Sequence, residues 1–345
     1  MGINVGYAMT VDVLNLEALR ELLVAHGVDV QGNLRATALP GGRSNLTFKV
    51  CDSNSSWVVR RPPLSGLTPS AHDVAREYRV THALQGTPVP TAATIALDGD
   101  GAIMGAPASV VTFVPGDVVR SREDLAALSD TQVRGVTMAL LDCLVDLHHV
   151  DHVAIGLDSF GRPEGFLDRQ VALWTQQWTR VAHQELPDIS RLSTLLADRV
   201  PVSSAAAIVH GDFRIDNAIL DLSTPDAVRA VVDWEMSTIG DPLTDVALMC
   251  VYRAPAFDAV LGMRAAWTSP RLPSPEALAE YYASASDRDL GDWGFYLALA
   301  YFKLAVIAEG IAHRARAGGA GQPDCIAAAE ATPVLAAAGI RALSG

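Results

Sequence analysis

The spacing of apolar residues changes near residue 117, and this change most restricts what the chain can fold into. Before it, short runs that alternate apolar and polar residues predict strands. These runs lie at about 45–51, 56–60, 92–97 and 108–114. Two helices are expected among them, one that begins after Asn15 and one at about 70–85. The first part of the chain is therefore expected to be rich in β-structure.

After Pro115-Gly116 the sequence predicts helices with one island of strands at 206–234. The predicted helices lie at about 122–149, 166–183, 189–199, 243–252, 275–286, 292–316 and 324–343. The pattern predicts an α+β fold with two lobes, a small β-rich lobe at 1–114 and a larger, mainly helical lobe at 115–345. A cleft between two such lobes is a usual place for a ligand.

The charge balance limits the classes of partner that the chain can bind, and the cysteines indicate its redox environment. The chain has 26 Lys and Arg against 39 Asp and Glu, and a net charge of −13 repels a phosphate backbone, so nucleic acid is not expected as a partner. No uninterrupted apolar run reaches the roughly 18 residues of a membrane span, and the first residues do not resemble an export signal. The four cysteines lie far apart without a CxxC pair, which indicates reduced thiols. We expect a cytoplasmic protein without membrane contact.

Within the β island, the segment HGDFRIDN places Asp212 five residues before Asn217, and Asp233 follows at the end of the apolar run AVVD. We suppose that the stretches 219–222 and 228–232 pair as an antiparallel hairpin. Leu222 then faces Val228, and Asn217 faces Asp233. The spacing therefore brings an amide oxygen and a carboxylate together at one end of the hairpin.

This pair of oxygen ligands suits Mg²⁺, which takes a few protein oxygens and leaves its other positions to water and phosphates. Asp212 lies next to the predicted ion, where its carboxylate can accept a proton from an attacking hydroxyl. The sequence thus predicts a phosphoryl-transfer site with Asp212 as catalytic base and Asn217 and Asp233 as metal ligands. His210 is expected to brace the loop and to have no catalytic role.

The blocks HGDFRIDN and VVDWEMSTIGDPLTDVA resemble the aminoglycoside phosphotransferase group of the protein-kinase-like fold. The chain is most similar to the kinase-like domains that are fused to, or encoded beside, acyl-CoA dehydrogenases. Supporting blocks run from LPGGRSNLTFKV to YFKLAVIAEGIAHRARAG and cover roughly residues 35–316. The resemblance implies a protein-kinase-like two-lobe fold and transfer of the γ-phosphoryl group of ATP.

The resemblance also implies where the nucleotide binds. A glycine-bearing turn covers the phosphates, with Gly42, Ser44 and Asn45 in that place. The family usually has a strand Lys that grips the α- and β-phosphates beside a helix Glu. In this chain Arg60 stands at that point with Glu77 as its partner, although Arg61 leaves the register open.

Adenine is expected to bind the main chain at Thr112 and Val114, and the sequence does not separate ATP from GTP. Asp241 is expected to cap a helix, and Asp245 resembles the family aspartate that steadies the catalytic loop. Residues of the subgroup blocks are candidates for the acceptor pocket or for surface ion pairs. They are Arg162, Arg169, Gln170, Lys303, Glu309 and Arg314.

The acceptor stays open at the level of sequence. The link to acyl-CoA dehydrogenases implies a hydroxyacyl-CoA or a related hydroxy acid, whereas the family name implies an aminoglycoside. A polycationic antibiotic requires an acidic pocket, and a CoA ester requires basic residues such as Lys303, Arg314 and Arg316. Because Arg60 replaces Lys, a catalytically silent nucleotide-binding pseudokinase is the alternative, and a scaffold protein is the third. The oligomeric state is unknown.

Overall fold

The computed structural model describes residues 14–39, 45–62, 73–202, 206–224, 227–317 and 324–344. The chain divides into two compact units. Unit 1 contains the residues up to Pro115 together with Arg229–Ser237, and unit 2 contains Gly116–Val228 and the residues from Thr238 onward. The expected lobes at 1–114 and 115–345 differ from these units mainly in the segment Arg229–Ser237. This segment belongs to unit 1 because Val231 N–H donates to the Pro90 carbonyl, and Arg76 donates to the Ser237 carbonyl.

Unit 1 is built on an antiparallel sheet of five strands in the order β1-β2-β3-β5-β4. Its core side chains, such as Phe48, Val50 and Val59, alternate with more exposed ones as expected for a sheet with one buried face. The strands are β1 (Arg35–Ala38), β2 (Leu46–Cys51), β3 (Ser56–Arg61), β4 (Thr94–Asp98) and β5 (Ala108–Thr112). All but β1 match a predicted strand.

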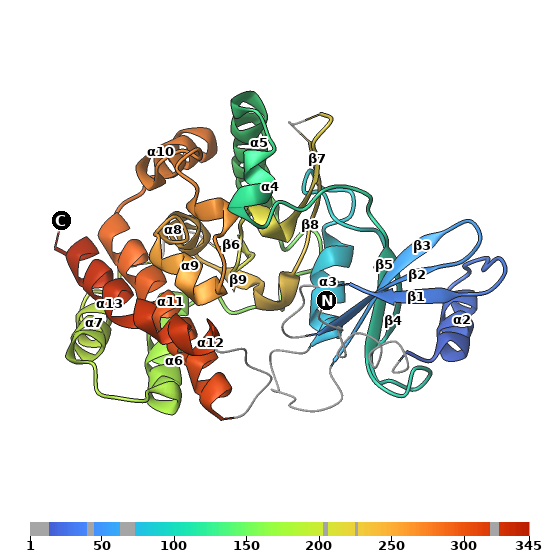
Figure 1. Cartoon of the computed structure of the whole chain (residues 1–345), viewed down its shortest axis with the longest axis horizontal. Helices are drawn as coiled ribbons and strands as arrows, with labels where there is room; N and C mark the ends of the chain where they lie inside the picture. The colour runs from blue at the N-terminus through green and yellow to red at the C-terminus, as the bar shows by residue number, and fades with distance from the viewer. Residues whose placement is uncertain are drawn as a thin grey trace, which may run out of the picture. The chain divides into compact units, whose positions relative to one another are not determined.

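Two helices pack on this sheet, as Figure 1 shows. In α2 (Leu16–Ala25), Asn15 accepts the backbone N–H groups of Glu17 and Ala18, so the predicted cap is confirmed. Buried leucines of α2, including Leu19 and Leu22, join the core of the sheet, and truncation of either to alanine is expected to cost about 2–5 kcal/mol. The other helix, α3 (Val74–Ala83), begins after Asp73, which caps it.

Unit 2 is mainly helical, as predicted. The predicted helix at 122–149 is two helices, because Ser129 starts a new one with a reciprocal pair of hydrogen bonds to Gln132. The short helix α9 was not predicted. The helices are α4 (Arg122–Ala126), α5 (Asp130–His149), α6 (Phe166–Val181), α7 (Pro187–Ala197), α8 (Leu243–Val251), α9 (Ala256–Leu261), α10 (Pro275–Ser286), α11 (Trp293–Arg316), α12 (Asp324–Ala327) and α13 (Ala331–Ala342).

Two short sheets interrupt the helices. Strand β6 (Ala207–Val209) pairs antiparallel with β9 (Thr238–Gly240), so that Ile208 lies opposite Ile239. Strands β7 (Ala218–Asp221) and β8 (Ala227–Val231) form the other sheet, which confirms the predicted pairing of these two strands. The border between the units falls inside β8, and the register that would place Asn217 opposite Asp233 stays a prediction.

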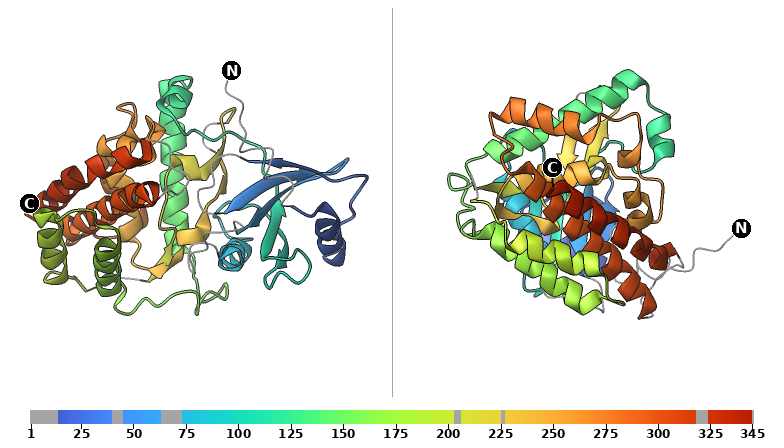
Figure 2. Two further views of the ribbon diagram at one scale, coloured as in Figure 1. Left: turned by 60° about the horizontal axis from the view of Figure 1, so that its bottom comes forward. Right: turned by 90° about the vertical axis from the view of Figure 1, so that its left-hand side faces the viewer.

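Two helical stretches, Trp293–Arg316 and Cys325–Ala342, have the length and composition of a membrane span. In the most apolar part of the first stretch 72% of the residues are buried inside the structure, and in the second 33% are buried. The first stretch is α11, which packs against α13, α8 and α6, and Figure 2 shows α13 beside it. Its apolar character is therefore that of a central core helix.

Candidate active site

A buried carboxylate from α8 holds the loop that precedes Asp212. Gly211 has a φ of +83°, a left-handed conformation that glycine adopts without strain. Asp245, in the first turn of α8, is only 1% exposed and accepts the backbone N–H groups of His210 at 2.6 Å and of Gly211 at 2.7 Å. The expectation that Asp245 steadies this loop is confirmed.

Two histidines support this arrangement. His210 is fully buried, and its Nδ1 accepts the backbone N–H of Asp212 at 3.2 Å, which confirms its predicted bracing role. His148 lies on the other side of Asp245, with Nε2 3.4 Å from Asp245 Oδ2 and Nδ1 2.7 Å from the Tyr282 hydroxyl. Burial lowers the pKa of His148 although Asp245 raises it. A neutral imidazole that donates through Nε2 and accepts at Nδ1 satisfies both contacts.

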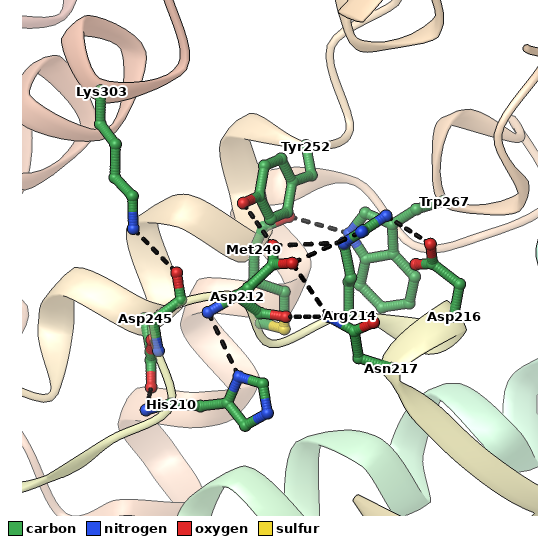
Figure 3. Close-up of polar contacts among 11 residues, drawn as sticks. His210, Asp212, Arg214, Asp216, Asn217, Asp245, Met249, Tyr252, Trp267 and Lys303 are labelled. Carbon is green, nitrogen blue, oxygen red and sulfur yellow. Dashed lines mark hydrogen bonds and ion pairs between the residues drawn. The ribbon is translucent and has the colours of Figure 1, made fainter. Parts of the chain in front are cut away.

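Three side chains donate to the Asp212 carboxylate, as Figure 3 shows. Oδ1 accepts the hydroxyl of Tyr252 at 2.6 Å and Nε–H of Arg214 at 3.2 Å. Oδ2 accepts Nδ2–H of Asn217 at 3.0 Å and Nη2–H of Arg214 at 3.4 Å. The Asp212 side chain is 23% exposed, so it is held within unit 2 and still reaches solvent in part.

The surroundings keep Asp212 ionised. Burial raises the pKa of Asp212, but the charge of Arg214 and the hydrogen bond from Tyr252 outweigh this effect, so the pKa lies below its usual range. Arg214 also pairs with Asp216, and its guanidinium lies over the Tyr252 ring at 5.7 Å. Burial lowers the pKa of Arg214, yet the two carboxylates raise it above its usual value, so this cation stays charged. Asp212 therefore has the protonation state of a base.

Asn217 uses its amide nitrogen within the site and leaves its amide oxygen uncommitted. It ends a short helical turn, Ile215–Asn217, and is 7% exposed. Its Nδ2 donates to the backbone carbonyl of Asp212 at 2.8 Å and to Asp212 Oδ2 at 3.0 Å. Among the described residues its Oδ1 accepts no hydrogen bond. Because a hard cation prefers such an uncommitted oxygen, the residue fits the predicted magnesium role.

In unit 1, Arg60 forms an ion pair with Glu77 of α3. Its Nη2 also lies 3.3 Å from Asp233 Oδ1. Arg61 is the next residue of β3 and points to the opposite face of the strand, so the register with Arg60 beside Glu77 is the one found. Burial raises the pKa of Glu77, against the lowering effect of Arg60. Burial lowers the pKa of Arg60, but the charges of Glu77 and Asp233 outweigh this effect, so the pKa lies above its usual value.

This cluster has hydrogen-bonding capacity that the described residues leave unused. Arg60 Nε and Glu77 Oε2 are buried and have no partner there. Asp233 has a φ of 68°, which is uncommon for a residue other than glycine, and its side chain is 37% exposed. A cation beside two carboxylates, one of them open to solvent, is a donor set that fits phosphate oxygens and a divalent metal.

The other predicted nucleotide residues differ in their placement. Gly42 and Ser44 lie outside the described residues, and Asn45 is 3% exposed at the start of the described segment. Thr112 donates its backbone N–H to Ala93 at 2.8 Å, so this group is committed to the sheet. Within the described part of the chain, Val114 N–H makes no backbone hydrogen bond, which leaves it open for the predicted contact with a base.

Of the candidate acceptor residues, Lys303 lies beside the catalytic loop. Its Nζ donates to the Gly211 carbonyl at 2.8 Å and lies 5.6 Å from the centre of the Trp174 ring. Burial lowers the pKa of Lys303, although Asp212 and Asp245 raise it. The others make contacts of their own. Arg169 donates to the carbonyls of Arg162 and Glu164, Gln170 accepts from Trp174 Nε1, Glu309 pairs with Arg316, and Arg314 is exposed.

Sequence reasoning did not assign Arg214 or Tyr252 to the site. Arg214 lies inside the HGDFRIDN block, so its position beside Asp212 is visible in the sequence. Tyr252 is 40 positions from Asp212. Only its spacing of seven residues from Asp245, across α8 to the residue that caps this helix, indicates that both side chains face the same way.

Three comparisons place this geometry among known proteins. A family model described as the phosphotransferase enzyme family matches residues 35–281. Acyl-CoA dehydrogenase family member 11 of Rattus norvegicus is 32% identical over 338 residues, which cover 96% of this chain and 43% of that protein. Acyl-CoA dehydrogenase family member 10 of Mus musculus is 32% identical over 304 residues, which cover 87% of this chain and 28% of that protein. The chain thus spans less than half the length of these relatives.

Solved structures agree with the fold. A crystal structure from Ralstonia eutropha, assigned as an aminoglycoside phosphotransferase, is 30% identical, with a TM-score of 0.82 and coverage of 96% of this chain and 98% of that one. The aminoglycoside phosphotransferase APH(4)-Ia, in a complex with ADP and hygromycin B, is 15% identical with a TM-score of 0.62, covering 94% and 98%. The predicted protein-kinase-like fold is confirmed.

Proposed function

Because the chain belongs to the phosphotransferase enzyme family, we propose that it is a small-molecule kinase. It transfers the γ-phosphoryl group of ATP to a hydroxyl group of its acceptor, with Mg²⁺ as cofactor. The observation that carries this proposal is the Asp212 carboxylate, ionised and held by Tyr252, Arg214 and Asn217 while 23% of its side chain stays exposed. A base that is fixed and accessible is what transfer to a hydroxyl requires.

In the proposed reaction Asp212 accepts the proton of the acceptor hydroxyl. The acceptor oxygen forms a bond to the γ-phosphorus as the bond from that phosphorus to the oxygen of ADP breaks. Asn217 and Asp233 would each offer an oxygen ligand to the metal, which would neutralise charge on the phosphates. Arg60, oriented by Glu77, binds phosphate oxygens through its fork of donors. Gly42, Ser44 and Asn45 are proposed to cover the phosphates. The main chain at Thr112 and Val114 is proposed to receive the base, at Thr112 through a group other than the N–H that the sheet already uses.

For the acceptor we propose a hydroxyacyl-CoA or a related hydroxy acid. The names of the curated relatives support this class, since they are acyl-CoA dehydrogenase family members. The Lys303 ammonium, with Nζ 2.8 Å from the Gly211 carbonyl, also favours an acceptor that carries a carbonyl or carboxylate near its hydroxyl.

A second candidate is an aminoglycoside phosphotransferase, which the solved neighbours favour by name. GTP is an alternative nucleotide, because one neighbour, aminoglycoside 2'-phosphotransferase-IIIa, was solved with GDP. This neighbour is 15% identical to the chain, with a TM-score of 0.61 and coverage of 94% of this chain and 99% of that one. We further propose a cytoplasmic location and a functional link to an acyl-CoA dehydrogenase.

The test incubates the purified chain with Mg²⁺ and ATP or GTP in the presence of defined acceptors. The acceptors are a set of hydroxyacyl-CoAs that differ in hydroxyl position, the matching free hydroxy acids, and hygromycin B as an aminoglycoside. Mass spectrometry detects an acceptor that gains one phosphoryl group, and Asp212→Asn is the matched control. We expect product with a hydroxyacyl-CoA or hydroxy acid only.

Phosphorylated hygromycin B would establish the second candidate. Binding of Mg-ATP without any phosphorylated acceptor and without ATP hydrolysis would favour the pseudokinase alternative and contradict the proposal. Absence of nucleotide binding would favour the scaffold alternative.

A further inference from the structure

We propose that Tyr252 is a positioning residue that keeps the Asp212 carboxylate from collapsing onto Arg214. The inference rests on the proposed function, because it concerns the base of the same reaction. It starts from the contact of the Tyr252 hydroxyl with Asp212 Oδ1, which at 2.6 Å is the shortest of the hydrogen bonds to this carboxylate. Hydroxyl–carboxylate bonds of this length are charge-assisted and strong.

The contacts with Arg214 are long by comparison. A full bidentate pair between guanidinium and carboxylate has nitrogen–oxygen distances of about 2.7–2.9 Å. Here Arg214 Nε is 3.2 Å from Oδ1 and Nη2 is 3.4 Å from Oδ2. The carboxylate is drawn instead toward Tyr252 on one oxygen and toward Asn217 on the other. Four donor contacts already fill the acceptor sites of this carboxylate, so the acceptor hydroxyl must displace one of them, and the long contacts with Arg214 give way most easily. A closer Arg214 would hold these sites more tightly.

Tyr252 directly follows the last residue of α8 and keeps a helical backbone conformation, which gives it the rigidity for this role. Asp245 and Tyr252 are seven residues apart, which is nearly two helical turns, so both side chains leave the same face about 10 Å apart along the axis. Asp245 fixes the backbone N–H groups of His210 and Gly211, just before Asp212. Tyr252 fixes the carboxylate of Asp212 itself. Helix α8 and the residue that caps its end therefore set both the backbone and the side chain of the proposed base, and Figure 3 shows Tyr252 beside Asp212.

The ring of Tyr252 is itself held. It is 4% exposed and stacks on Phe257 with ring centroids 4.4 Å apart and an angle of 26° between the planes. Its hydroxyl therefore has a fixed position, and substitution by phenylalanine keeps the ring and removes only the donor. The chain offers a matched control, because Tyr281 makes a bond of the same 2.6 Å length to Asp142 at the surface.

The experiment compares Tyr252→Phe with Tyr281→Phe and the unchanged chain. The readouts are kcat and KM for Mg-ATP in two reactions. One is ATP hydrolysis, with water as the acceptor, and the other is phosphoryl transfer to whichever hydroxyacyl-CoA of the set above gains phosphate. We expect Tyr252→Phe to lower kcat about 10- to 100-fold and to leave KM for ATP within about twofold, since misplacing a reacting group costs this much. Tyr281→Phe is expected to change neither value.

An unchanged kcat in Tyr252→Phe overturns the inference. A loss of kcat that is matched by losses of thermal stability and of ATP affinity also overturns it, because it would show a purely structural role. Phe257→Leu is the second variant, in case Tyr252→Phe does not fold. It keeps the hydroxyl and loosens the stacked ring, so we expect a smaller loss of kcat, and an unchanged kcat contradicts the proposal. If the unchanged chain transfers no phosphate to water or to any acceptor, the proposed function has failed instead.

Discussion

The cluster around Asp212 in unit 2 and the cluster of Arg60, Glu77 and Asp233 in unit 1 differ in how fully their hydrogen-bonding groups are paired. Both carboxylate oxygens of Asp212 receive two hydrogen bonds each from within unit 2. In unit 1, Arg60 Nε and Glu77 Oε2 are buried without a partner among the described residues, and Asp233 is more exposed than Asp212. The comparison indicates that the protein itself preorganises the proposed base, whereas the proposed nucleotide would complete the cluster around Arg60.

Replacement of the base should have the largest effect. Asp212→Asn is expected to lower kcat by about 10²–10⁴-fold, because the amide cannot accept the hydroxyl proton. Affinity for Mg-ATP should change little if the nucleotide is held by unit 1. Single-turnover product formation and isothermal titration calorimetry measure the two quantities. A loss of affinity as large as the loss of kcat would break the distinction between the two clusters.

The metal position of unit 1 should show the next largest effect. Asp233→Asn removes a charge, and asparagine tolerates the left-handed backbone at this position. We expect affinity for Mg-ATP to fall about 10- to 100-fold, which corresponds to a charged contact of about 1.5–3 kcal/mol. Affinity for ATP measured with EDTA should change less. Asp100→Asn, an exposed change in the same unit, is the control and should leave both affinities unaltered.

Arg60, the ion-pair partner of Glu77, allows a more specific test of nucleotide binding by unit 1. Arg60→Gln is expected to weaken ATP binding about tenfold, since it removes a charged hydrogen-bond donor. Arg61→Gln should weaken binding less, because Arg61 lies on the other face of β3. Calorimetry with ATP compares the two variants, together with their thermal midpoints. A larger loss of affinity in Arg61→Gln than in Arg60→Gln would show that Arg61, and not Arg60, contacts the phosphates.

The framework behind the base should respond to pH with the smallest effect. Burial lowers the pKa of His148 in the folded chain, so the unfolded chain binds a proton first as the pH falls below about 6.5. The free energy of unfolding should therefore decrease from about pH 6.5 downward, until the pH reaches the folded pKa, by at most about 1.4 kcal/mol per pH unit.

His148→Gln should flatten this decrease, and urea unfolding at several pH values between 7.5 and 5 measures it. His183→Gln, at an exposed position, is the control. An equal slope in His148→Gln and the unchanged chain would show that His148 is not buried in its neutral form.

The fold class and the core of the site were accessible from sequence because their signals are local. The HGDFRIDN block, the pairing of β7 and β8 and the cap at Asn15 all depend on residues close together in the chain. The break between α4 and α5 was missed because the apolar pattern continues through it, although Ser129 and Gln132 carry the spacing of a capping box.

The contacts of Tyr252 and Lys303 were not accessible. Each joins the catalytic loop to a helix that lies 40 or 92 positions further along the chain. Spacing in one sequence does not show which residues of a buried helix face a distant loop. Only the packing of α8 and α11 decides that Tyr252 contacts Asp212 and that Lys303 contacts Gly211.

The span between Asp245 and Tyr252 restricts how this chain can vary. A helical residue advances about 100° around the axis, so one residue inserted or deleted between them would turn Tyr252 away from the face that carries Asp245. The length of α8 is then as strict a requirement as the identity of the residues it presents. Functional relatives that differ in chain length are expected to gain or lose residues outside this two-turn interval.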